Sequence, residues 1–171
     1  MPETANKKQF YEELALQLRG LLSGELDAVA NAANMSALLY HTLADVNWVG
    51  FYFLRGGELV VGPFQGKPAC VRIALGRGVC GTAAEARHSL VVPDVHAFPG
   101  HIACDAVSRS ELVVPLILGD AVVGVLDLDS PLPGRFDKED RAGCEQLAAI
   151  YVEASKVGLL PSEHSCPGAP R

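Results

Sequence analysis

The chain has 171 residues, of which 49% are hydrophobic, with a mean hydropathy of +0.21 and a net charge of −6. This length and composition fit one packed domain and argue against general disorder. The acidic balance, without a cluster of Lys or Arg, argues against nucleic acid and anionic membranes as partners. The N-terminus is polar and no apolar run is long enough to span a bilayer. We therefore expect a cytoplasmic protein without a secretory signal.

Two helices are predicted at the start of the chain. Apolar residues at helical spacing place them over 5–22 and 26–43. Runs rich in β-branched and aromatic residues then predict strands; these lie at 46–54, 58–62, 70–75, 90–92, 111–118 and 121–127. A last helix is expected to begin near Asp137, which is a good N-cap.

This order of elements predicts the fold class. Helices at both ends and mostly hairpin-linked strands between them are typical of an α+β domain, with the helices on one face of a mainly antiparallel sheet. The other face would then be free for a small-molecule pocket. We expect one domain over residues 1–158 and a loose Pro- and Ser-rich tail over 159–171.

The five cysteines fall into two groups. Cys144 lies on the apolar face of the last predicted helix and is expected to be buried, and Cys166 in the tail has no assigned role. Cys70, Cys80 and Cys104 each lie beside a segment that contains Gly or Pro. In a reducing compartment, three thiols in such loops favour reactive cysteines over a static disulfide scaffold.

Zinc is an alternative for the same region. His96, His101 and Cys104, together with Cys80 or His88, offer nitrogen and sulfur ligands. However, there is no C-x₂-C pair, and the spacings match no structural zinc pattern. We therefore expect no metal site.

The segment "GRGVCG" at 76–81 matches a dinucleotide-binding pattern. The segment after it is short for a crossover helix, and no acidic residue ends a second strand about twenty residues further on. We expect instead that these glycines give a flexible loop that carries Cys80 toward another sulfur.

Three carboxylates lie close to the predicted hairpin of 110–131. Asp127 and Asp129 share one face of an extended strand, and Glu111 begins the partner strand. A turn of only Gly119 and Asp120 would put Glu111 on the opposite face from the two aspartates. If the three carboxylates converge, the turn must hold an odd number of residues or the hairpin must contain a β-bulge. We predict one of these two.

Six segments, taken in chain order, resemble one known family. They are "NWVGFY", "GPFQGKPACVRI", "GRGVCGTAA", "DVHAFPGHIACDA", "SELVVPL" and "GVLDLDS". Together they resemble the free methionine-(R)-sulfoxide reductases, which are built on a GAF domain, over residues 5–157. Other GAF domains share the fold and the "VPL…GV" hairpin but lack the three cysteines.

The resemblance implies a reaction and its sulfur chemistry. Free L-methionine-(R)-S-oxide would be reduced to L-methionine by a homodimer that has no bound cofactor and draws its electrons from thioredoxin. Cys104 matches the catalytic cysteine, which would attack the sulfoxide sulfur and become a sulfenic acid. Cys80 matches the main resolving cysteine, and Cys70 matches a further cysteine that can form a disulfide.

The resemblance also assigns substrate contacts. Glu111, Asp127 and Asp129 match the carboxylates that hold the substrate, and Trp48 and Tyr52 match its aromatic wall. One of the carboxylates would protonate the sulfoxide oxygen, and the others would pair with the substrate ammonium.

The loop that contains "PGHIAC" is expected to bind the carboxylate of the substrate. Backbone N–H groups there, such as those of Ile102 and Ala103, would form an anion nest. His96 and His101 are interpreted as ordinary hydrogen-bonded loop histidines.

Two other functions remain open at this point. A non-catalytic GAF module that binds a small molecule or senses redox state would explain the fold and the disulfide cysteines, but not three carboxylates beside one thiol. A reductase for protein-bound methionine sulfoxide would need an open groove and no group that holds an ammonium.

Overall fold

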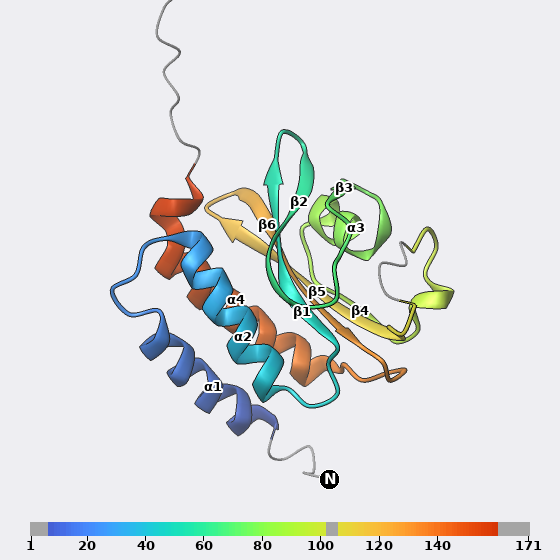
Figure 1. Cartoon of the computed structure of the whole chain (residues 1–171), viewed down its shortest axis with the longest axis horizontal. Helices are drawn as coiled ribbons and strands as arrows, with labels where there is room; N and C mark the ends of the chain where they lie inside the picture. The colour runs from blue at the N-terminus through green and yellow to red at the C-terminus, as the bar shows by residue number, and fades with distance from the viewer. Residues whose placement is uncertain (1–6, 102–105, 161–171) are drawn as a thin grey trace, which may run out of the picture.

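The computed structural model describes residues 7–101 and 106–160, which form one curled antiparallel sheet with helices on both faces. The six strands are in the order β3-β2-β1-β6-β5-β4 (Figure 1). The strands are β1 (Trp48–Arg55), β2 (Glu58–Gly66), β3 (Arg72–Ala74), β4 (Leu90–Val92), β5 (Ser110–Leu118) and β6 (Ala121–Ser130). The helices are α1 (Lys7–Leu21), α2 (Ala28–Thr42), α3 (Gly78–Ala86) and α4 (Lys138–Leu159), with a 3₁₀ turn at Val95–Ala97. The α+β class and the antiparallel sheet predicted from the sequence are confirmed.

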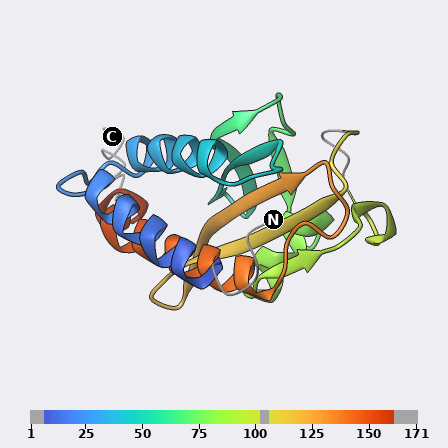
Figure 2. The ribbon, with the colours of Figure 1, turned by 90° about the horizontal axis from the view of Figure 1, so that it is seen from below.

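Three helices form the layer on one face of the sheet. Figure 2 shows α1, α2 and α4 together on that side, with α2 and α4 against the strands and α1 packed on α4. Alternate strand residues such as Phe51, Leu112 and Leu126 point into this layer and are fully buried. This face therefore holds the larger part of the hydrophobic core.

The start of α4 is fixed to α1 by buried charge. Asp137 is the N-cap, as predicted, and forms a capping box with Asp140. Asp140, which is 1% exposed, accepts hydrogen bonds from Tyr11, Lys7 and Arg135. A carboxylate so deeply buried is stable only because these donors surround it.

The β5–β6 hairpin contains a β-bulge, one of the two alternatives predicted from the sequence. Leu118 pairs with Ala121 around a two-residue turn, but the register shifts between Leu116 and Ile117. Beyond that shift Glu111 lies opposite Asp129. One extra residue on β6 thus turns all three carboxylates to the same face of the sheet.

The segment around Cys80 differs from the expectation. Residues Gly78–Ala86 form helix α3, so Cys80 lies in a helix and is 4% exposed, not on a flexible loop. The close approach of α3 to β3 depends on Gly81, where a Cβ atom would collide with the carbonyl oxygen of Ala74. The glycines of this motif serve close packing as well as chain reversal.

Helix α3 covers the second face of the sheet and runs between strands at opposite edges, β3 and β4. It therefore does not belong to a parallel βαβ unit, which removes the structural basis of a dinucleotide site. None of the helices in the described ranges is both long and apolar enough to cross a membrane.

Candidate active site

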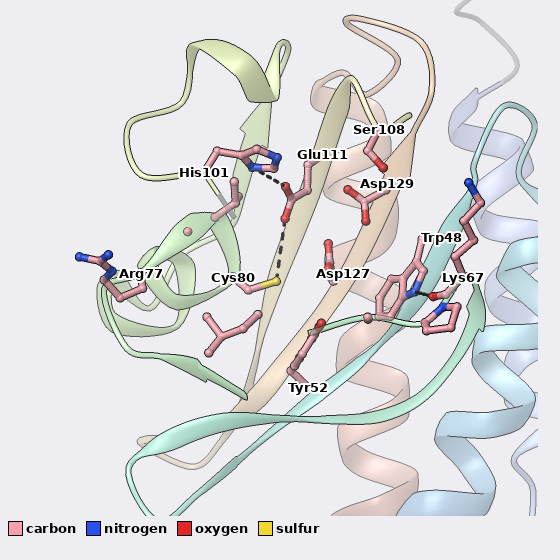
Figure 3. A pocket seen from close by; sticks show the side chains of 15 residues that line it. Trp48, Tyr52, Lys67, Arg77, Cys80, His101, Ser108, Glu111, Asp127 and Asp129 are labelled. Atoms are coloured by element: carbon pink, nitrogen blue, oxygen red, sulfur yellow. Dashed lines mark hydrogen bonds and ion pairs between the residues drawn. The ribbon is translucent and has the colours of Figure 1, made fainter. Parts of the chain in front are cut away.

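A pocket lies between α3 and the second face of the sheet (Figure 3). Trp48 and Tyr52 of β1, Asp127 and Asp129 of β6, and Glu111 of β5 all point to this face. Strand pairing sets their spacing, because Trp48 and Glu111 lie on either side of Asp129. The alternation of side chains along three neighbouring strands thus gathers the acidic and aromatic groups into one site.

Two glycines make room for the indole of Trp48. A Cβ atom at Gly50 would lie 2.7 Å from Trp48 Cη2, and one at Gly66 would lie 2.6 Å from Trp48 Cδ1. The indole stacks on Phe64 with ring centroids 5.1 Å apart, and its N–H donates to the carbonyl oxygen of Lys67 at 3.0 Å. A rigid, buried aromatic surface therefore forms one wall of the pocket.

Tyr52 connects this wall to the segment of Cys70. Its ring stacks beside that of Trp48, with centroids 5.9 Å apart, and its hydroxyl donates to the carbonyl oxygen of Cys70 at 3.1 Å. Burial, together with the negative charge of Asp127, raises the pKa of the Tyr52 hydroxyl. It therefore stays a hydrogen-bond donor throughout the neutral range.

Cys80 approaches the carboxylates from the other side. Its Sγ donates to Glu111 Oε1 across 3.9 Å, the contact drawn as a dashed line in Figure 3. Burial raises the pKa of the Cys80 thiol well above its usual value, and the negative charges of Asp127 and Glu111 raise it further. The thiol is therefore protonated at neutral pH.

Glu111 and Asp127 are easier to protonate than ordinary carboxyl groups for the same reason. Burial raises the pKa of Asp127 to about 7, and burial together with the charges of Asp127 and Asp129 raises that of Glu111 well above its usual range. His101 lies beside Glu111, with its Nδ1 4.0 Å from Glu111 Oε2. Burial, with the nearby His96, lowers the pKa of His101, so its ring favours the neutral form. The site is thus acidic, and its central groups, Cys80, Glu111 and Asp127, are buried.

Six of the side chains assigned from the resemblance line this pocket: Trp48, Tyr52, Cys80, Glu111, Asp127 and Asp129. Cys70 is disulfide-bonded, and its partner is neither Cys80 nor Cys144, which are both free. Cys144 is fully buried, as predicted. Ile102, Ala103, Cys104 and Cys166 lie outside the described residues.

Some contributors were not identified from the sequence. Gly50 and Gly66 form the slot for Trp48, and Phe64 backs it. His101 was interpreted as an ordinary loop histidine, yet it lies against Glu111. In "WVGFY", Gly50 lies two residues from both Trp48 and Tyr52 and therefore on their face of the strand, which could have identified it. The sequence holds no comparable signal for the contact of His101.

The chain is similar to known proteins over most of its length. The GAF domain family matches residues 18–152. The free methionine-R-sulfoxide reductase of Escherichia coli is 54% identical, over 84% of this chain and 87% of its own length.

Two solved structures extend the comparison. The free methionine-R-sulfoxide reductase of Neisseria meningitidis, in complex with its substrate, is 42% identical with a TM-score of 0.86, over 91% of this chain and 94% of that one. A Burkholderia vietnamiensis protein crystallised as a candidate GAF sensor is 61% identical with a TM-score of 0.86, over 90% of this chain and 98% of that one. These likenesses span nearly the whole chain, and it therefore belongs to the GAF domain family and, within it, to the free methionine-R-sulfoxide reductases, a group of oxidoreductases.

Proposed function

We propose that this protein reduces free L-methionine-(R)-S-oxide to L-methionine in the cytoplasm, through a sulfenic acid and a disulfide, with electrons from thioredoxin. The observation that carries the proposal is the convergence of three carboxylates, two stacked aromatic rings and a thiol in one pocket. The names of the relatives, and the structure of one of them with its substrate, support the same activity.

The carboxylates recognise the ammonium group of a free amino acid. Glu111 and Asp127 are buried and have no Lys or Arg ion pair among the described residues. An incoming ammonium supplies the missing positive charge and several N–H donors. A peptide-bound or acylated methionine lacks that charge, so its binding would leave carboxylates buried and unpaired, at a cost of a few kcal/mol.

The remaining parts of the substrate find complementary partners. The faces of Trp48 and Tyr52 offer a polarizable surface to the S-methyl and thioether groups. The substrate carboxylate is assigned to backbone N–H groups of the segment with Ile102 and Ala103, which lies outside the described residues.

The reaction begins with attack of the Cys104 thiolate on the sulfoxide sulfur. The sulfoxide oxygen must gain a proton as its bond to sulfur is lost, because unprotonated oxide is a very poor leaving group. Glu111 and Asp127, with their raised pKa values, are suited to hold that proton near neutral pH. The products are L-methionine and Cys104 sulfenic acid, so the two electrons gained by the substrate come from the cysteine.

A second thiol then condenses with the sulfenic acid and releases water. Cys80 and Cys70 are the two resolving cysteines, and the resemblance put Cys80 first. Two observations favour Cys70 for this step: it is already disulfide-bonded, and the Cys80 thiol is buried with a raised pKa. Because a thiolate is the attacking species, a buried, protonated thiol reacts slowly. Thioredoxin would then reduce the disulfide by exchange.

The protein is also proposed to act as a homodimer without a bound cofactor. Sedimentation equilibrium should give twice the chain mass of 18.1 kDa. A single chain mass at micromolar concentration would contradict the dimer and leave the chemistry untouched.

Single turnover of the reduced protein tests the reaction. Fully reduced enzyme is mixed with free L-methionine-(R)-S-oxide or with the (S)-epimer, and methionine and cysteine linkages are measured by mass spectrometry. We expect methionine and one new disulfide with the (R)-epimer alone, and peptide mapping then shows whether Cys70 or Cys80 is linked. No thiol oxidation with either epimer would favour a GAF sensor over an enzyme.

Replacement of the catalytic thiol gives the matching prediction. Cys104→Ser should abolish methionine formation, because a hydroxyl cannot form the sulfenic acid. Its circular dichroism and thermal unfolding should stay those of the wild type. Substantial remaining turnover would overturn the assignment of Cys104.

A further inference from the structure

Three potential metal ligands meet in the pocket, and a fourth lies beside one of them. Cys80 Sγ and one carboxylate oxygen each from Glu111 and Asp127 all lie within 4.8 Å of one another, and all three residues are buried. His101 Nδ1 is 4.0 Å from Glu111 Oε2. Figure 3 shows the four side chains pointing toward one another from α3, β5, β6 and the segment that follows the 3₁₀ turn.

Two polar side-chain atoms of these residues make no hydrogen bond among the described residues. Asp127 Oδ1 and His101 Nδ1 are buried and make no hydrogen bond, and Asp127 is 5% exposed. Buried polar atoms are almost always paired, so each unpaired one calls for a reason. A cation between Asp127, Glu111 and Cys80 would satisfy the Asp127 oxygen directly and bring the imidazole within reach.

We propose that Cys80, Glu111, Asp127 and His101 form a binding site for a thiophilic divalent cation of the Zn²⁺ class, which excludes the substrate from the pocket. One thiolate, one imidazole and two carboxylates are the donor types of four-coordinate zinc sites. Mg²⁺ and Ca²⁺ prefer six or more oxygen ligands and gain little from sulfur, so the donor set selects against them.

The distances are consistent with such a site. Zinc–oxygen and zinc–sulfur bonds of about 2.0 and 2.3 Å place the ligand atoms of a tetrahedron roughly 3.3–3.8 Å apart. The thiol and Glu111 are 3.9 Å apart, and His101 and Glu111 are 4.0 Å apart. These two pairs need to contract by less than about 1 Å, which side-chain rotation supplies. His101 lies outside the group of three ligands within 4.8 Å of one another, so its ring must move further toward Cys80 and Asp127.

The competition with substrate rests on the proposed function. Glu111 and Asp127 are the carboxylates assigned to the substrate ammonium, so a metal ion on them occupies the position of that charge. The ion also forms a bond to the Cys80 sulfur as the thiol proton leaves to solvent. The cation is thus an inhibitor in this account and takes no part in the reduction.

Cobalt titration tests the site with a readout that needs no turnover. Protein that retains its Cys70 disulfide is titrated with Co²⁺, a spectroscopic substitute for Zn²⁺, in the absence of reductant. We expect one ion per chain and a thiolate-to-cobalt charge-transfer band. Cys80→Ser should remove the band, and Asp127→Asn should weaken binding at least tenfold. The matched controls Cys144→Ala and Cys166→Ser should keep the charge-transfer band and the affinity of the wild type.

A second arm tests competition. Without reductant the oxidised enzyme does not consume substrate, so free L-methionine-(R)-S-oxide can be added as a ligand and should displace the cobalt. The metal site is overturned if the charge-transfer band persists in Cys80→Ser or if the wild type shows no band. This outcome is separate from the proposed function, because chelator-treated enzyme can still reduce the sulfoxide. A band that responds to Cys80 but not to substrate upholds the metal site and overturns the shared position.

Discussion

Asp127 is the residue at which stability and recognition oppose each other. Its carboxyl is buried between Glu111 and Cys80, and one of its oxygens has no hydrogen-bond partner in the part of the chain that the structure describes. Burial raises its pKa from 3.8 to about 7. Such a group is easily protonated in the folded protein and would be ionised in the unfolded chain. This arrangement favours binding of a cationic ligand, which would compensate the buried negative charge.

The sign of the resulting pH dependence follows from the raised pKa. Below pH 3.8 the group is protonated in both states and costs nothing. Between 3.8 and about 7 the folded protein binds more protons than the unfolded chain, so stability falls as the pH rises. Asp127→Asn, melted in the presence of a chelator, should gain roughly 2–4 kcal/mol at pH 8 and almost nothing at pH 4. Equal gains at both pH values would contradict the raised pKa.

At the scale of elements, the position of α3 decides where Cys80 lies. Gly81 brings the helix against the carbonyl oxygen of Ala74, and the first turn of α3 carries the thiol to Glu111. A methyl group at this position has no flexible neighbour to displace, because the obstructing atom belongs to the backbone of β3.

Gly81→Ala should therefore move α3 away from β3 and lower kcat/KM at least tenfold. It should also lower the free energy of unfolding by about 1–3 kcal/mol, as overpacking does. Gly20→Ala is the matched control, since a Cβ there meets nothing within 4 Å and α1 should become more stable by up to about 1 kcal/mol. Unchanged activity in Gly81→Ala would show that α3 does not need this close approach.

Much of this arrangement could be predicted from the sequence. Period-two alternation placed Asp127 and Asp129 on one face, and the need for Glu111 to join them predicted either an odd-numbered turn or a β-bulge. The structure has the bulge, between Leu116 and Ile117. The nine residues of α3 are mostly small, and their buried face of Val79, Cys80, Ala83 and Ala84 is short and only weakly apolar, so the helix and the burial of Cys80 were missed. They depend on packing between α3 and distant strands, which local patterns do not contain.

Across the whole molecule, stability and chemistry are placed on opposite faces of the sheet. The helix layer holds the main core and the buried charges around Asp140, and the pocket with α3 lies on the other side. A change in one layer should therefore leave the other almost unaffected, because the two share only the sheet.

Asp140→Asn tests this separation. The loss of its charge leaves Lys7 and Arg135 without their buried partner, and we expect a loss of roughly 3 kcal/mol of stability. The folded variant should keep the kcat/KM of the wild type at a temperature well below its melting point. A parallel loss of activity would show that the helix layer supports the pocket directly.

The measurement that tests the central claim most directly is the ratio of kcat/KM for free L-methionine-(R)-S-oxide to that for its N-acetyl derivative. If Glu111, Asp127 and Asp129 recognise the ammonium group, the free amino acid should be favoured by about a hundredfold or more. Asp127→Asn should reduce that ratio by slowing the free substrate far more than the acetylated one. Comparable turnover of the two substrates by the wild type would contradict recognition by these carboxylates.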